Sequence, residues 1–338
     1  MKKLQVIFVY LLMLGACRTP TPTALLPSPT IAATTSIPSL TPVLPVIIPT
    51  STPSFGNEFL KLSALEPGLF IAFVEYSSDK IYLSAASFDG DYQGRLAESV
   101  GGYGFAISPD KKLLADLPYI LNLESETREY YADLENCTHP NWSPDSTKLA
   151  ISCPTNDYHH DDIYIFSMRD QKKIPVTNCE HEAFSCGSPL WSPDNRWLAS
   201  YRGLGGAGTS QLTGLHILDT TCPSGLDNCW YDEKGVDASP SFSWSPNGQL
   251  LATVDNGKVS VYQIKNSRLI LSESYEIDMV LDWVTWLDNN NELLVLEYSD
   301  KGGFIISRET GLMSSLTKAQ LEFFQSQIHD SMFVFVIP

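Results

Sequence analysis

The sequence predicts an all-β protein, a β-propeller of four-stranded blades, and two repeated features carry this prediction. The first is a four-residue phrase in five copies: Ile107-Ser108-Pro109-Asp110, Trp142-Ser143-Pro144-Asp145, Trp191-Ser192-Pro193-Asp194, Trp244-Ser245-Pro246-Asn247 and the altered Trp286-Leu287-Asp288-Asn289. The second is a pair of apolar or small residues seven and eight positions after the start of each phrase: Leu114-Ala115, Leu149-Ala150, Leu198-Ala199, Leu251-Ala252 and Leu293-Leu294. The copies begin at positions 107, 142, 191, 244 and 286, and such spacings are typical of propeller blades rather than of helical repeats.

Each phrase predicts the end of one strand, a tight turn and the start of the next strand. Proline fixes φ for the second position of a type I turn, while the Ser before it and the Asp or Asn after it hydrogen-bond the local backbone. A third, largely apolar strand follows in several units, at 80–83, 162–166, 214–218 and 258–262, and shorter fourth strands are indicated at 94–97, 128–131 and 173–177. Four strands make a small twisted sheet that must stack on its neighbours to bury both faces.

The phrase, with Leu-Ala behind it and Asp162-Ile163-Tyr164 beyond, resembles the WD40-like repeat of TolB-type β-propellers over about residues 57–338. The resemblance implies the fold and no particular function, because the motif residues are turn formers and blade core. Six blades fit the clear units, and the apolar run 332–337 would then close the ring beside the first blade. Seven blades are the alternative, since the first blade lacks the full phrase and the last copy lacks its proline.

Residues 1–16 have the regions of a secretory signal: Lys2-Lys3, an apolar stretch from Leu4 to Leu14, and small residues before Cys17. The apolar stretch is too short for a stable membrane span. The tetrapeptide Leu14-Gly15-Ala16-Cys17 resembles the bacterial lipobox, which implies that Cys17 becomes a lipid-modified N-terminus. The alternative is a secretory signal with an incidental cysteine.

The segment 17–56 is expected to be a disordered tether. From residue 18 to residue 56 it contains nine of the 22 prolines, many Thr and Ser, no acidic residue and one basic residue, Arg18. Such a composition resists helix and sheet and stiffens the chain toward polyproline II. Because multiple acyl chains anchor stably where one is marginal, we expect the propeller at 57–338 to stand off the extracytoplasmic side of a bacterial membrane.

The propeller is strongly acidic. Lys2, Lys3 and Arg18 account for three of the 22 basic residues, which leaves 19 basic against 39 acidic residues and a net charge near −20. Such a domain repels nucleic acid and anionic membrane surfaces, so nucleic acid is not an expected partner. The acidity either serves solubility alone or favours a cationic partner.

Six cysteines follow Cys17, and an even count in an exported domain favours disulfides. Cys137 and Cys153 should face each other across the antiparallel pair around the Pro144-Asp145 turn, because their positions sum to about the same value as those of Trp142 and Leu149. Cys179 with Cys186, and Cys222 with Cys229, each bracket a short loop. A zinc site at Cys179, His181 and Cys186 is the alternative, although it lacks a fourth ligand of usual spacing.

The extra length of the third and fourth blades indicates which face binds. The Ser-Pro-Asp turns lie on one face of the disc, here called the turn face; the connections between second and third strands and between blades lie on the other, here called the crossover face. We expect four long segments on the crossover face: 154–161, 179–188, 202–213 and 222–239. Loops gathered on one face of a rigid scaffold are where function concentrates. The candidate binding residues are Asp157, Tyr158, His159, His160, Asp161, Arg202, Trp230, Tyr231 and Asp232.

These residues favour a binding module for protein or glycan at the cell envelope rather than an enzyme, with no cofactor besides the lipid on Cys17. Trp230 and Tyr231 could stack on a sugar or anchor a protein partner, or only pack the loop. The run 157–162 could hold a divalent metal or simply be solvated. TolB-like repeats also occur in metal-dependent polysaccharide lyases, so such an enzyme is the alternative; an envelope spacer without ligand is a third possibility.

Overall fold

In the computed structural model, the described residues form twenty-four strands in six separate four-stranded antiparallel sheets. The structure describes residues 59–337 except for 63–64, 66–67, 78–79, 89–92, 100–103, 156–159, 180–183, 205–211, 223–229, 235–240, 256, 282, 288, 298–301, 318–319 and 321–331. The expected signal segment 1–16, Cys17 and the linker 17–56 therefore lie outside the described residues. Within the described part of the chain, no helix combines the length and the apolar character that crossing a membrane requires.

The strands are distributed over six blades in chain order, which confirms the expected six-bladed propeller and excludes seven blades. Blade one is β24 (Met332–Ile337), β1 (Gly68–Ser77), β2 (Lys80–Ser87) and β3 (Gln93–Ser99); blade two is β4 (Phe105–Ile107), β5 (Leu113–Asp116), β6 (Tyr119–Asn122) and β7 (Arg128–Tyr130). Blade three is β8 (Thr138–Trp142), β9 (Lys148–Pro154), β10 (Asp161–Ser167) and β11 (Lys172–Pro175); blade four is β12 (Phe184–Trp191), β13 (Trp197–Leu204), β14 (Leu212–Asp219) and β15 (Trp230–Lys234). Blade five is β16 (Phe242–Trp244), β17 (Leu250–Asp255), β18 (Lys258–Lys265) and β19 (Arg268–Glu276); blade six is β20 (Trp283–Trp286), β21 (Glu292–Leu296), β22 (Gly303–Ser307) and β23 (Met313–Ser315).

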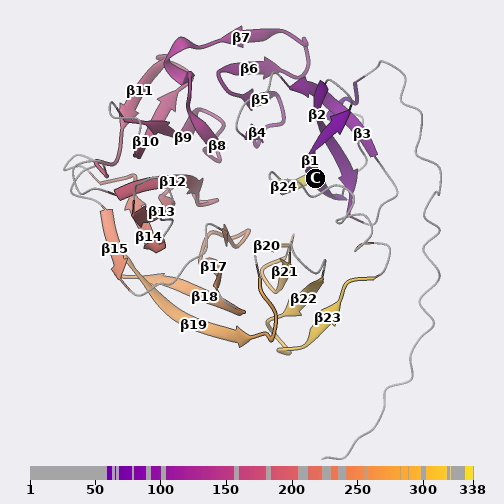
Figure 1. The fold of residues 1–338 in the computed structure, drawn as a ribbon, viewed down its shortest axis with the longest axis vertical. Helices are drawn as coiled ribbons and strands as arrows, with labels where there is room; N and C mark the ends of the chain where they lie inside the picture. Colours follow the sequence, from indigo (N-terminus) through magenta and orange to yellow (C-terminus); the bar gives the residue numbers. More distant parts are fainter. Residues whose placement is uncertain are drawn as a thin grey trace, which may run out of the picture. The chain divides into compact units, whose positions relative to one another are not determined.

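The last strand closes the ring. In Figure 1 the sheets are arranged around a common centre, with the first strand of each blade innermost and the fourth outermost. Blade one takes its innermost strand, β24, from the other end of the chain, and β24 pairs antiparallel with β1 from Gly68 opposite Ile337 to Phe73 opposite Met332. The expected closing strand at 332–337 is thereby confirmed, and the first blade lacks the phrase because another segment fills that place.

The Ser-Pro-Asp turns are built as the sequence predicts. At the third blade the Ser146 N–H donates to the Ser143 carbonyl at 2.8 Å, and the Ser143 hydroxyl donates to Asp145 at 2.6 Å. The same pattern recurs around Ser108, Ser192 and Ser245. The residue after each Asp or Asn has positive φ, from 57° at Ser146 to 70° at Gly248, which completes the return of the chain.

The turns are also joined to one another across blades. Asn195 of the fourth blade donates its side-chain amide to Asp145 of the third at 3.1 Å. The Asp110 N–H donates to the Ser146 hydroxyl, and the Asn247 N–H donates to the Asn290 side chain. Many polar groups of the turn face are therefore already hydrogen-bonded to other parts of the propeller.

Three of the four phrase tryptophans tie adjacent blades together, beyond filling the core. The Trp142 indole N–H donates to the Ala106 carbonyl of the preceding blade at 2.9 Å, and Trp244 and Trp286 do the same toward Leu190 and Ser243. The indole rings are about 95% buried, and the Leu-Ala pairs behind them are almost wholly so. Blade stacking thus depends on both apolar burial and a repeated hydrogen bond.

Two of the three expected disulfides, Cys137 with Cys153 and Cys179 with Cys186, are confirmed. Cys222 is also disulfide-bonded, but Cys229 lies outside the described residues, so that pairing stays a prediction. These bonds take up the cysteines of the alternative zinc site. A β-bulge between Thr138 and Asn141 shifts the register by one residue and so brings Cys137 opposite Cys153.

The prediction that the segment 222–239 lies on the crossover face is wrong in part. The segment 222–239 is not a single loop, because β15 occupies residues 230–234 as the outermost strand of blade four. Residues 220–229 consequently join a third strand to a fourth strand, which is a turn-face connection. The Thr220 hydroxyl bears this out, since it bonds the Asn195 and Arg196 carbonyls at the Ser-Pro-Asp turn.

Candidate functional site

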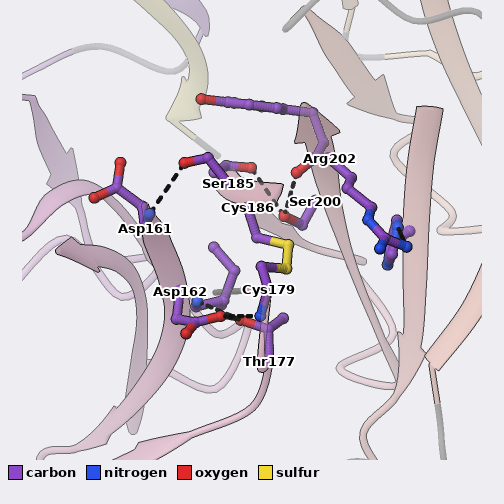
Figure 2. The surroundings of a disulfide bond; sticks show 12 residues. Asp161, Asp162, Thr177, Cys179, Ser185, Cys186, Ser200 and Arg202 are labelled. Atoms are coloured by element: carbon purple, nitrogen blue, oxygen red, sulfur yellow. Dashed lines mark hydrogen bonds between the residues drawn. A yellow bond between two sulfur atoms is a disulfide. The ribbon is translucent and has the colours of Figure 1, made fainter. Parts of the chain in front are cut away.

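The crossover face of blades three and four is held by a hydrogen-bonded frame around a disulfide (Figure 2). Asp162 is buried and accepts bonds from the Thr177 hydroxyl at 2.7 Å and the Cys179 N–H at 2.6 Å. The Cys179–Cys186 bond then joins this segment to β12 of the next blade. Asp162, which the sequence places among possible metal ligands, therefore serves the scaffold.

Asp161 begins β10, directly beside this frame. Its N–H donates to the Ser185 hydroxyl of β12 at 3.0 Å, which fixes the start of β10 against blade four. Its carboxylate receives no hydrogen bond from the residues that the structure describes. Burial raises the pKa of the Asp161 carboxyl above its ordinary value; the charge of His139 opposes this rise, that of Asp162 adds to it, and that of His160 opposes it.

His139 lies on β8, the innermost strand of blade three, inside the bulge that also aligns Cys137. Its φ of 50° turns the backbone out of the regular strand. The side chain is solvent-exposed, with a contact of 2.9 Å between Nδ1 and the Thr138 hydroxyl. The surrounding protein lowers the pKa of His139, and Asp161 works against that shift.

Tyr201 of β13 reaches the same region by crossing β12. A Cβ built on Gly187 would lie 2.5 Å from the Tyr201 hydroxyl oxygen and 2.6 Å from its Cζ, so the ring end lies directly over the glycine. Burial raises the pKa of Tyr201, and the charge of Asp161 raises it further. Asp161 thus acts electrostatically on both His139 and Tyr201.

Arg202 does not join this group. Its guanidinium Nη1 lies 3.5 Å from the His216 Nε2, and Figure 2 shows its side chain extending away from Asp161. Arg202 occupies, in blade four, the register position that Cys153 holds in blade three: Arg202 pairs with Cys186 as Cys153 lies across from Cys137. The position next to the inner strand is therefore filled by a cation in one blade and a disulfide in the other.

The structure brings together only part of the predicted set. Asp161 belongs to the cluster that it forms with His139 and Tyr201, and the charge of His160 also acts on the Asp161 carboxyl. Asp157, Tyr158 and His159 lie outside the described residues. Trp230, Tyr231 and Asp232 form part of β15 at the outer edge of blade four, paired with Leu218, Ile217 and His216, so they do not lie in a loop as the sequence suggested.

Sequence reasoning missed His139 and Tyr201 as site residues. His139 stands three residues before a phrase tryptophan, and Tyr201 stands three residues after the Leu198 of its Leu-Ala pair, where both read as blade core. The only usable signal was Gly187 in the inner strand, because a glycine in a strand often marks close approach of another group.

The side chains of His139, Asp161 and Tyr201 can all accept hydrogen bonds, and one of them is a carboxylate. A neutral imidazole, a phenol and a carboxylate can each accept a bond from a ligand, and the imidazole and phenol can also donate. Among the described residues no group of three His, Cys, Asp or Glu is placed to hold a metal ion.

Comparison with known proteins supports the fold alone. No protein-family model matches the sequence, and no curated protein matches it. The structure is similar to TolB from Acinetobacter baumannii, with a TM-score of 0.51 and 17% identity, covering 74% of this chain and 64% of TolB. It is also similar to the β-propeller domain of Cps50 (Swd1) from Myceliophteria thermophila, with a TM-score of 0.53 and 11% identity over 73% of this chain and 86% of that one. A chain of a nidogen/laminin complex gives a TM-score of 0.52 and 7% identity over 79% of this chain and 98% of that one.

Proposed function

We propose that the mature protein is a lipid-anchored, extracytoplasmic β-propeller that binds a protein or glycan of the cell envelope through its crossover face at blades three and four. The single observation that carries this proposal is the cluster of His139, Asp161 and Tyr201. His139 lies on β8, Asp161 begins β10 and bonds Ser185 of β12, and the Tyr201 hydroxyl lies over Gly187 of β12.

The contrast between the two faces supports the proposal. On the turn face, Ser and Asp side chains are engaged in their own turns and in the neighbouring blade. On the crossover face, the carboxylate of Asp161 and the hydroxyl of Tyr201 make no hydrogen bond to described residues. Buried or half-buried polar groups that the protein does not satisfy are commonly satisfied by water or a ligand.

The disulfides support both the location and the binding role. Bonds such as Cys137–Cys153 persist in oxidising compartments, in agreement with export. The Cys179–Cys186 bond and the Asp162 hydrogen bonds hold the site before a ligand arrives, which lowers the ordering cost of binding.

Affinity capture from envelope extracts tests the proposal, with the full chain compared with an Asp161→Asn variant and a Gln249→Ala variant. Gln249 is exposed on the turn face. The wild type and Gln249→Ala should retain the same partner, whereas Asp161→Asn should lose most of it. Equal capture by all three proteins would contradict the assignment of the binding face.

A further inference from the structure

The Cys137–Cys153 disulfide lies beside a lysine ammonium group. The Nζ of Lys173, on β11, is 3.9 Å from the Sγ of Cys137 and 3.9 Å from the Sγ of Cys153. The same Nζ lies 4.9 Å from the centre of the Tyr164 ring, and this cation–π contact helps to hold the ammonium beside the bridge. A positive charge is therefore equally close to both sulfur atoms.

The surroundings give this ammonium no close counter-charge. Among the described residues no carboxylate lies within ion-pair distance of Lys173, and the charge that acts on it is that of Asp133, which is solvent-exposed. Burial lowers the pKa of Lys173 from its ordinary value of 10.5, and Asp133 opposes this shift. An anion formed next to such a half-buried cation would stabilise it and be stabilised by it.

The other confirmed disulfide has the opposite electrostatic environment. The buried Asp162 carboxylate accepts the N–H of Cys179 at 2.6 Å (Figure 2). In the part of the chain that the structure describes, no lysine or arginine donates a hydrogen bond to the sulfur of Cys179 or Cys186. A carboxylate near a cysteine opposes formation of a thiolate, and an ammonium favours it. The two bridges should therefore differ in how readily they are reduced.

We propose that Cys137–Cys153 is a redox-sensitive bridge that a dithiol reductant opens, with Lys173 stabilising the thiolate that forms. One thiolate of the reductant attacks the sulfur of either cysteine, the S–S bond breaks, and the other cysteine leaves with the electron pair as a thiolate. The second thiolate of the reductant then attacks the mixed disulfide and releases the first cysteine. The reductant is oxidised to a disulfide, the bridge takes up two electrons, and the two cysteines take up the protons that the dithiol gave up.

Lys173 offsets the effect of burial on the reduced bridge. Cys137 is 3% exposed and Cys153 is 2% exposed, and burial in apolar surroundings alone would disfavour a thiolate. Because the ammonium makes the reduced state more stable, it raises the reduction potential of the bridge. Reduction would release the chain that enters β8 from the end of β9. This inference goes beyond the proposed binding function and does not depend on the binding partner.

The experiment is a redox titration of the full chain in detergent, in buffers of reduced and oxidised dithiothreitol at neutral pH. Free thiols are trapped with acid and alkylated, and peptide mapping gives the reduced fraction of each bridge. In wild type, Cys137–Cys153 should be half reduced at a lower ratio of reduced to oxidised dithiothreitol than Cys179–Cys186. Lys173→Met should raise the ratio that Cys137–Cys153 requires about tenfold, which corresponds to about 30 mV for a two-electron couple.

Lys172→Met is the matched control, because it removes the same charge from the adjacent, exposed position of β11. It should leave the midpoint of Cys137–Cys153 unchanged, and Lys173→Arg, which keeps the charge, should stay near wild type. A lysine that only packed the folded chain would stabilise the oxidised and reduced forms alike and would not move the midpoint.

The inference is overturned if Lys173→Met and Lys172→Met give the same midpoint, or if Cys179–Cys186 is reduced before Cys137–Cys153 in wild type. The order of the two bridges in wild type requires no variant, so it decides the question even where Lys173→Met does not fold.

Discussion

Single residues show how this fold divides its positions between scaffold and site. Gly248, Gly257 and Gly311 all have positive φ, but their surroundings differ. A Cβ at Gly311 would meet nothing within 4 Å, at Gly248 it would lie 3.3 Å from the Asp194 nitrogen, and at Gly257 it would lie 2.6 Å from the Ile277 carbonyl oxygen. Substitution at Gly311 therefore tests backbone strain alone, substitution at Gly248 adds a contact with the neighbouring blade, and substitution at Gly257 adds a clash with backbone carbonyl oxygens.

Replacing each of these glycines with alanine should give a graded loss of stability. Gly311→Ala should cost about 1 kcal/mol through φ strain alone. Gly248→Ala should cost somewhat more, because it also presses on the fourth blade, and Gly257→Ala about 3 kcal/mol or more because backbone atoms must move. Urea unfolding measures the order; equal losses at all three sites would show that these contacts do not matter.

The pH dependence of stability should report His139. The surrounding protein lowers its pKa from the ordinary 6.5, so the folded chain binds this proton more weakly than the unfolded chain does. The contribution is absent well above pH 6.5, and the free energy of unfolding should fall as the pH decreases below 6.5. Comparing unfolding curves of wild type and His139→Gln between neutral and mildly acidic pH tests this: the variant should lack that part of the slope, and identical slopes would contradict it.

At the scale of elements, the β-bulge in β8 shows why the pairing of two cysteines could be predicted when the irregular strand register that aligns them could not. Trp142 pairs with Leu149, and the bulge shifts the register before Cys137 reaches Cys153. The same irregularity occurs in β12 between Gly187 and Leu190, three residues before the next phrase tryptophan. The first bulge contains His139, and the second borders Gly187, over which the end of the Tyr201 ring lies.

Removal of the disulfide in blade three should destabilise the propeller without removing the site. A double variant Cys137→Ala/Cys153→Ala frees a loop of sequence separation 16, which predicts a loss of about 3 kcal/mol under oxidising conditions. Denaturant unfolding measures the loss. A double variant as stable as wild type would show that the bond contributes no constraint.

Much of the fold could be predicted from the sequence because the phrase Trp-Ser-Pro-Asp specifies a turn chemically and repeats at blade spacing. Blade number and ring closure also followed, since the run 332–337 had no other unit to join. The site could be predicted only in part. Asp161 was found through its polar loop, but Tyr201 reaches the cluster across another strand, and Trp230 was taken for a loop residue because β15 is short and acidic.

At the scale of the whole molecule, closure of the ring depends on β24, which among the described strands pairs with β1 alone. Deleting residues 332–338 would leave blade one without its innermost strand and expose the edge of β1. We expect the deletion to abolish a cooperative thermal transition, as followed by circular dichroism. Deleting the linker 18–56 should leave the transition in place, and a cooperative transition in both deletions would contradict the closing role of β24.

Membrane attachment should depend on Cys17 alone. Cys17→Ala should leave the protein without lipid and either unprocessed or mislocalised, because the apolar stretch before it is too short to replace an acyl anchor. Metabolic labelling with a fatty-acid probe measures this, and absence of label on the wild-type protein would refute lipidation.

The central claim is that ligands meet the crossover face at blades three and four, and site-specific photo-crosslinking in cells tests it most directly. A benzoylphenylalanine placed at His160 lies beside Asp161, and one placed at Gln249 lies exposed on the turn face. The account predicts a crosslinked envelope partner from position 160, lost in Asp161→Asn, and none from position 249. Crosslinking from position 249 alone, or equally from both positions, would contradict it.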